Sequence, residues 1–337
     1  MADSKALPPE KPISPSPGGR GVLASVAAAC KPYVELTRLN KPIGILYLYL
    51  PGLTSTFVAA SLARPAMPIG HLLKANVLLF LSAAMMRGAG CSWNDTLDQD
   101  LDRQVSRTRL RPVARGTIST FAAHVCTVCQ LLVFFYLQTL LPAPMAHVST
   151  TPCFYASIPF IIATGMYPLA KRVTNYPQVF LSIPMSWGVA VAFPALGLDL
   201  FASSTSMVAA VSLFLSNVAW VVLYDMIYAF QDIKDDIKAG ILSMAVRYEK
   251  HPKFVLSLLS LMQTAFLLIT TFAMEAGFVC FVGMLGTMAV LGCMINRVDL
   301  GEPASCGWWF KYGCLFVSGP TVFGFLGEYS MRVSGRL

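Results

Sequence analysis

Two clusters of carboxylates lie at the ends of long apolar segments in this 337-residue chain. In the first, Asn94, Asp98 and Asp102 are spaced i, i+4, i+8, and in the second Asp232 and Asp236 are spaced i, i+4. On a helix each set would lie along one face, where like charges repel unless a cation sits between them. Oxygen ligands without nearby His or Cys suit Mg²⁺, which usually bridges one or two carboxylates to phosphate. The spacing therefore predicts a site that holds a diphosphate through magnesium.

Basic side chains flank both clusters and could neutralise the charge that develops on a departing diphosphate. The candidates are Arg107, Arg111, Lys171, Arg172, Lys234 and Lys238. Tyr167 lies four residues before Lys171, so a phenol and an ammonium would share one helical face at the membrane edge. The alternative role for these basic residues is to set the membrane topology.

The composition predicts an all-α, polytopic membrane protein. The chain is 55% hydrophobic and 12% charged, with a mean hydropathy of +0.62, whereas soluble domains carry about 25% charged residues. A net charge of +8 would favour a nucleic-acid partner in a soluble protein, but here it is better explained by topology-setting loops, so no nucleic-acid partner is expected. Nine cysteines, an odd number and mostly in apolar stretches, argue against a disulfide framework.

Nine apolar segments are long enough to cross a bilayer. They lie near residues 43–61, 73–92, 118–140, 152–170, 178–196, 207–230, 254–274, 277–296 and 309–327. Lys and Arg gather in the loops after the second, fourth and sixth segments, whereas the loops after the third, fifth and seventh hold none. The positive-inside rule then places the basic loops and both carboxylate clusters on the cytoplasmic side.

The N-terminal region differs from the rest of the chain. Residues 1–20 are rich in proline and glycine and predict a disordered tail, and 21–39 predict a short interfacial helix. We therefore divide the chain into a tail and lead-in over 1–35 and a transmembrane domain over 36–337. The tail lacks the features of a secretory signal or a mitochondrial presequence, which favours an endomembrane over the mitochondrial inner membrane.

Five motifs together resemble the signatures of the UbiA-type intramembrane prenyltransferases. They are 38–44 (RLNKPIG), 88–102 (GAGCSWNDTLDQDLD), 107–112 (RTRLRP), 167–171 (YPLAK) and 224–236 (YDMIYAFQDIKDD). The resemblance runs from about residue 36 to the C-terminus. It implies a bundle of nine helices with a central cavity open sideways to membrane lipid. It also implies transfer of an isoprenoid chain from its diphosphate to an aromatic acceptor.

The resemblance also implies roles for individual residues. One Mg²⁺ would be held by Asn94, Asp98 and Asp102 and the other by Asp232 and Asp236, and the diphosphate would be bound by Tyr167, Lys171, Arg172 and Arg111. The allylic carbon–oxygen bond would then ionise, and apolar and aromatic walls would exclude water from the cation and stabilise it.

Two further residues lie seven positions before the clusters. Asp225 is two helical turns before Asp232 and is our candidate for orienting the acceptor or assisting its deprotonation. Arg87 is two turns before Asn94, deep in its segment, where an arginine needs an anionic partner. An acidic acceptor or Asp225 could supply that partner, and the alternative for Arg87 is a structural ion pair.

Three functional interpretations stay open. The chain could farnesylate a phenolic or polyketide-derived acceptor in fungal meroterpenoid biosynthesis, or prenylate 4-hydroxybenzoate in ubiquinone biosynthesis. Ser92 and Trp93 before the first cluster, Phe230 in the second motif and the N-terminus favour the first, if these side chains reshape the acceptor pocket. An ion-coupled transporter is the third, but it would more often place its acids near the membrane midplane.

Overall fold

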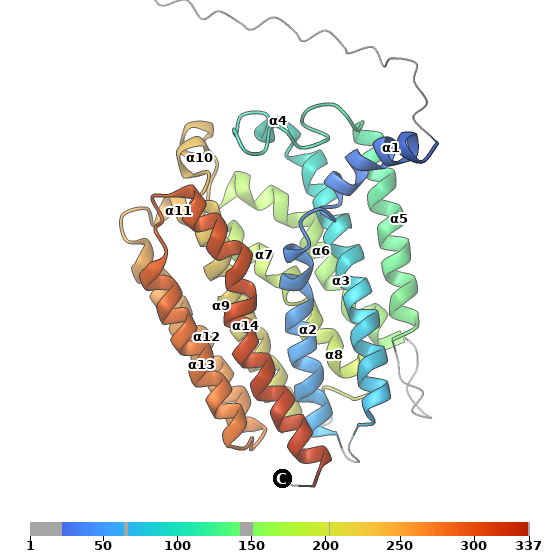
Figure 1. The fold of residues 1–337 in the computed structure, drawn as a ribbon, viewed down its shortest axis with the longest axis vertical. Coiled ribbons are helices and arrows are strands. Elements are labelled where there is room, and N and C mark those ends of the chain that lie inside the picture. The colour runs from blue at the N-terminus through green and yellow to red at the C-terminus, as the bar shows by residue number, and fades with distance from the viewer. Residues whose placement is uncertain (1–21, 64–66, 142–150, 202, 336–337) are drawn as a thin grey trace, which may run out of the picture.

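The computed structural model describes residues 22–63, 67–141, 151–201 and 203–335, and they form a bundle of helices (Figure 1). The predicted disordered tail over 1–20 lies outside the described residues. The helices are α1 (Val22–Leu36), α2 (Ile43–Leu62), α3 (Ile69–Leu97), α4 (Gln99–Asp102), α5 (Thr120–Thr139), α6 (Thr151–Val173), α7 (Pro177–Met185), α8 (Trp187–Ala195), α9 (Ser204–Ala229), α10 (Ile233–Ala239), α11 (Met244–Arg247), α12 (Pro252–Ala273), α13 (Phe278–Arg297) and α14 (Pro303–Val333).

The long helices match the apolar segments found in the sequence. Among the described residues, eight helical stretches are long and apolar enough to cross a membrane. The ninth predicted segment corresponds to α14, which has 31 residues and runs along the full height of the bundle beside α13 and α2 (Figure 1). The all-α architecture is therefore confirmed, and α1 occupies the stretch in which a lead-in helix was predicted.

The predicted segment over 178–196 is one crossing made of two helices, α7 and α8, which meet at Ser186. The Asn217 side chain stabilises this break by donating a 2.8 Å hydrogen bond to Ser186 Oγ. Just beyond it, α8 approaches α2 closely, since a Cβ on Gly188 would lie 2.8 Å from the Gly52 backbone. Only glycine allows the two backbones to pack at this distance.

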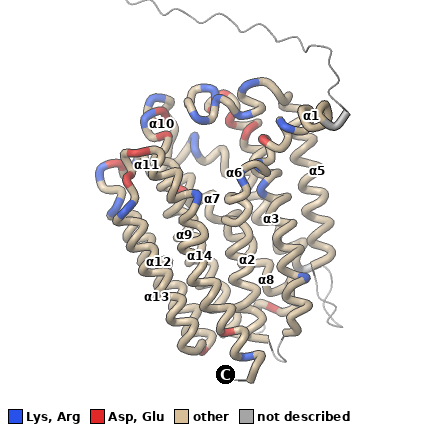
Figure 2. The backbone as a smooth tube through the Cα atoms, in the orientation of Figure 1, with Lys and Arg blue, Asp and Glu red and all other residues tan. Residues whose placement is uncertain are grey.

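Charged residues gather at one end of the bundle, where α1, α4, α10 and α11 lie, and the opposite end carries few of them (Figure 2). Both carboxylate clusters are therefore at the same end, as the loop charges predicted.

Beneath the charged end, four aromatic residues pack at the centre of the bundle, and we call them the aromatic layer: Tyr47 of α2, Trp220 and Tyr224 of α9, and Phe310 of α14. The ring centroids of Tyr47 and Tyr224 are 3.9 Å apart, and those of Trp220 and Tyr224 are 5.3 Å apart. The Tyr47 hydroxyl donates a 2.8 Å hydrogen bond to the carbonyl oxygen of Phe310, which orients its ring.

Candidate active site

Each carboxylate row crosses a helix break, and neither follows one uninterrupted helix as the spacing had led us to expect. In the first row, α3 ends at Leu97 and Asp98 joins it to α4. In the second row, Asp232 lies in the turn between α9 and α10, with Asp236 in the following helix. Neither the Asp98 nor the Asp232 side chain accepts a capping hydrogen bond from the following helix, so both carboxylates are directed to other partners. Backbone hydrogen bonds of 2.7–2.9 Å still join residues four apart, so the i, i+4 spacing persists.

In the first row the acids pair with basic residues from other parts of the chain. Lys171 Nζ lies 2.9 Å from Asp98 Oδ2, and Arg111 Nη1 lies 2.8 Å from Asp102 Oδ2. Lys171 Nζ also lies 5.2 Å from the centre of the Tyr167 ring, so the predicted phenol–ammonium face is confirmed. Burial raises the pKa of Asp102, although the Arg111 charge opposes this shift. The row is therefore buried and neutralised by protein cations.

Arg107, which lies in the loop that follows the first row, pairs with the second row. Its Nε lies 2.9 Å from Asp232 Oδ1, its Nη2 lies 2.5 Å from Asp232 Oδ2, and its Nη1 donates a 2.6 Å hydrogen bond to the Tyr228 hydroxyl. Asp236 forms no ion pair with any described residue. Burial and the neighbouring Asp232 charge raise the pKa of Asp236 to about 6. This is the repulsion that the i, i+4 spacing predicted.

Unpartnered oxygens on α3 and at its end fit a hard cation. Asn94 Oδ1 and Asp98 Oδ1 are buried and accept no hydrogen bond from the described residues, and Asp98 is only 2% exposed. No group of three or more His, Cys, Asp or Glu side chains converges on one point in the described part of the chain. Mg²⁺ does not require such a group, because it takes one or two carboxylates together with water and phosphate oxygens. The oxygen-only donors therefore fit Mg²⁺, and the five-residue ligand set remains a prediction.

Arg87 and Asp225 lie near this site without being paired. Arg87 appears in none of the ion pairs of the described chain, its Nε is buried without a partner, and its guanidinium packs on Gly44. Asp225 forms no hydrogen bond or ion pair with a described residue, but interacts electrostatically with Lys171, Arg87 and Arg107. The structural ion pair considered for Arg87 is therefore absent from the described chain, and the two groups are free for a ligand.

Two predicted substrate-binding residues occupy different places. The Arg172 Nη2 atom donates a 2.7 Å hydrogen bond to the carbonyl oxygen of Leu97, so this side chain caps the C-terminus of α3. Lys234 is exposed on α10 and contacts none of the predicted site residues in the described chain. The structure thus groups Lys171, Arg111 and Arg107 with the acids, but not Lys234.

Sequence reasoning missed a buried pair that supports the first row. Arg38 Nη2 lies 2.7 Å from Asp95 Oδ1 and 2.8 Å from Oδ2, and Arg111 Nη1 lies 3.3 Å from the same carboxylate. Asp95 is 1% exposed, and Arg38 has a positive φ of 59°. Asp95 stands in the quoted motif, but its burial could not be inferred from spacing. Asp95 therefore connects Arg38, at the α1–α2 junction, to Arg111, which pairs with Asp102.

The side chains invoked to distinguish the acceptor form no hydrogen bond with the carboxylate rows in the described chain. Trp93 Nε1 donates a 3.1 Å hydrogen bond to the Gly165 carbonyl of α6, and the Ser92 hydroxyl donates to the Gly88 carbonyl within α3. Phe230 is buried in the hydrophobic core. These contacts position the three side chains, and their influence on the acceptor pocket remains a prediction.

Known proteins share both the sequence and the fold. The UbiA prenyltransferase family model matches residues 52–319. The mitochondrial 4-hydroxybenzoate polyprenyltransferase of Saccharomyces cerevisiae is 37% identical over 288 residues, covering 83% of this chain and 72% of that protein. The DMOA farnesyltransferase of Aspergillus novofumigatus is 31% identical, covering 93% and 95%. A solved UbiA homologue from Archaeoglobus fulgidus, bound to GPP and Mg²⁺, has a TM-score of 0.59 at 15% identity, covering 89% and 99%.

These matches favour the enzymatic interpretation over the transporter, because they span the residues that form both carboxylate rows. The chain belongs to the UbiA prenyltransferase family and is a multi-pass integral membrane prenyltransferase.

Proposed function

We propose that the protein transfers a farnesyl chain from its diphosphate to a phenolic or polyketide-derived aromatic acid, using Mg²⁺. The main support is a set of unpartnered polar groups near one end of the bundle. The orphaned oxygens of Asn94 and Asp98 call for a cation, and the unpaired guanidinium of Arg87 calls for an anion.

The basic residues would bind the donor. Mg²⁺, when bound by the carboxylate rows, supplies Lewis-acid stabilisation of the leaving diphosphate. Lys171, Arg111 and Arg107 are already held beside the acids by ion pairs of 2.9 Å or less, so their charges are pre-positioned for the diphosphate oxygens. The allylic carbon–oxygen bond breaks, and its electron pair leaves with the diphosphate.

The acceptor would lie between Arg87 and Asp225. Arg87 would bind its carboxylate, since a planar guanidinium matches a carboxylate with two hydrogen bonds. Asp225, which has no partner of its own, would orient the acceptor hydroxyl and take up the proton that the ring releases after attack on the allylic cation. The rings of the aromatic layer would stabilise that cation through their faces.

We also propose a biosynthetic pathway and a membrane for the protein. A 4-hydroxybenzoate polyprenyltransferase and a DMOA farnesyltransferase are 37% and 31% identical to this chain, so similarity does not separate the two pathways. We favour meroterpenoid biosynthesis in an endomembrane, with the site on the cytoplasmic side, where the loop charges predict it. Prenylation of 4-hydroxybenzoate in ubiquinone biosynthesis is the alternative.

Purified protein, incubated with Mg²⁺ and farnesyl diphosphate, should prenylate a polyketide-derived phenolic acid, detected by product mass. Efficient turnover of 4-hydroxybenzoate with long-chain donors would reject the meroterpenoid assignment. No product and no diphosphate release with any acceptor would reject the proposed function.

Arg87→Leu tests the acceptor site. The variant should raise the KM for a carboxylated acceptor by about 10-fold or more, since a charged hydrogen bond is lost. The methyl ester of the same acceptor should react with similar KM in both proteins. Equal effects on acid and ester would mean that Arg87 acts elsewhere.

A further inference from the structure

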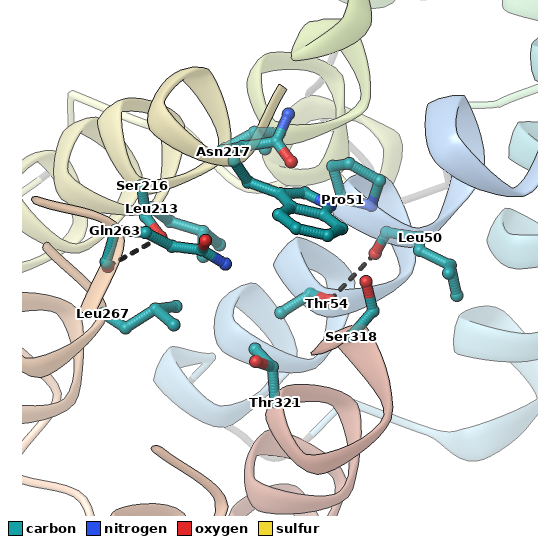
Figure 3. Close-up of a pocket in the computed structure, with 12 residues that line it drawn as sticks. Leu50, Pro51, Thr54, Leu213, Ser216, Asn217, Gln263, Leu267, Ser318 and Thr321 are labelled. Carbon is teal, nitrogen blue, oxygen red and sulfur yellow. Dashed lines mark hydrogen bonds between the residues drawn. The ribbon is translucent and has the colours of Figure 1, made fainter. Parts of the chain in front are cut away.

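A cavity of about 40 Å³ lies below the aromatic layer, between α2, α8, α9, α12 and α14 (Figure 3). We call it the polar chamber, because half of its lining side chains are polar: Thr54, Ser216, Asn217, Gln263, Ser318 and Thr321. These residues come from four helices and surround the same space, with the Gln263 amide directed into it (Figure 3). None of them belongs to the carboxylate site.

The Gln263 side chain has an unmet need for a hydrogen-bond donor. The residue is 5% exposed, and its Oε1 is buried and accepts no hydrogen bond from any described residue. It lies in the middle of the α12 crossing, where lipid offers no donor. The Ser216 hydroxyl is directed to the Gln263 backbone carbonyl at 3.1 Å, and Thr54 to Leu50, so neither satisfies the amide oxygen.

Water fits this space by size and by chemistry. A cavity needs roughly 10–15 Å³ for each water centre and two to four polar partners, and the chamber offers both. A hydrocarbon tail in the same place would leave the Gln263 oxygen unpaired. We propose that the polar chamber binds water inside the bundle, and that the aromatic layer seals this water from the prenyl cation.

The aromatic layer is placed to act as that seal. Trp220 lines the chamber and packs on Tyr224 and Tyr47, with ring centroids 5.3 Å and 6.1 Å away. Asp225, the proposed acceptor-binding residue, follows Trp220 by five residues, about 7.5 Å along α9. The rings of Trp220 and Tyr224 therefore lie between the chamber and the level of Asp225 along α9.

The seal matters because water competes with the acceptor for the cation. After the allylic carbon–oxygen bond breaks, a water oxygen can bond to that carbon and lose a proton to the released diphosphate. The products are a prenyl alcohol and diphosphate, and the donor is wasted. This inference rests on the proposed function, since it assumes that an allylic cation forms.

Hydration can be measured without turnover. Hydroxyl-radical footprinting of the full-length protein in nanodiscs should label the chamber-lining residues Leu213 and Leu267, and Gln263→Leu should reduce that labelling severalfold. Labelling of surface residues in the charged loops should not change. Absence of chamber labelling in the wild-type protein would overturn the proposal.

The seal is tested by product ratios. Trp220→Leu, or the milder Trp220→Phe, should raise the ratio of prenyl alcohol to prenylated product severalfold at saturating acceptor. Adding Gln263→Leu should lower the ratio again, because the chamber would be dry. Phe325→Leu, which shortens a fully buried ring outside the chamber, is the matched control and should leave the ratio unchanged.

A ratio that does not rise in either Trp220 variant would overturn the sealing role. A ratio that rises in the Trp220 variants but is not lowered by adding Gln263→Leu would also overturn the sealing role. The competing water would then come from outside the polar chamber. If the wild-type protein released no diphosphate, the proposed function and the sealing role would both fail, while footprinting would still decide whether the chamber is hydrated.

Discussion

Two buried charge networks lie at opposite ends of the bundle and differ in how completely they are satisfied. At the end opposite the carboxylate rows, Glu328 accepts 2.7 Å hydrogen bonds from Arg332 Nε and from the Gly277 N–H. Arg332 also donates to the Met274 and Ser61 carbonyls, at 2.6 Å and 3.2 Å. This network joins the ends of α2, α12, α13 and α14, and both of its carboxylate oxygens are used.

The aspartates of the first carboxylate row are also buried, but they are incompletely satisfied. One oxygen of Asp98 pairs with Lys171 while the other has no partner, and the Asn94 oxygen, one helical turn earlier, is also unpaired. An unpaired buried oxygen costs free energy that a ligand can recover. Burial of charge by itself therefore does not identify a site in this bundle. The unmet hydrogen-bonding capacity does.

The largest expected effect is the loss of turnover in Asp98→Ala or Asp232→Ala. Removing a group that stabilises the leaving diphosphate through the metal should cost on the order of 10³-fold in kcat, with the thermal transition retained. Asp100→Ala is the matched control, because the Asp100 side chain is 80% exposed and should affect turnover little. Near-normal rates in either site variant would refute the metal assignment for that row.

Glu328→Ala should act on stability and not on chemistry. It would leave Arg332 buried without its carboxylate, which costs about 3–5 kcal/mol in the free energy of unfolding. Thermal unfolding of the detergent-solubilised protein measures this loss. The exposed Glu249→Ala is its control. Unchanged stability would show that the satisfied network contributes nothing to the fold.

Arg38→Ala probes the support beneath the carboxylate rows. Asp95 would lose its bidentate partner and draw Arg111 away from Asp102, so the Mg²⁺ concentration for half-maximal activity should rise about 10- to 100-fold. Arg38→Lys should recover part of the loss. A drop in kcat with unchanged Mg²⁺ dependence would argue for a different role.

The smallest effect is expected from Lys234→Ala. Its side chain is exposed and makes no contact with the other predicted site residues in the described chain, so kcat/KM should change less than about twofold. A large loss of kcat/KM would instead mean that Lys234 moves to contact the bound diphosphate, as the predicted substrate-binding role requires.

The sequence predicted much of this protein because its signals are local. A hydrocarbon layer demands long apolar helices, so the crossings could be located from composition alone. Asp residues four apart on a helix repel each other unless a cation is present, so their spacing predicted the carboxylate rows. The same i, i+4 spacing predicted the Tyr167–Lys171 pair. Loop charges placed both rows at one end.

Tertiary packing decided which of those groups are used. Asp95, Arg38 and the Glu328–Arg332 pair look ordinary in the sequence, and Lys234 looks as plausible as Lys171. Burial and pairing depend on which helices meet, and contacts between residues far apart in the chain leave no periodic trace. The helix breaks at Asp98 and Ser186 and the unpaired Gln263 oxygen likewise emerged only when several helices enclosed the same space.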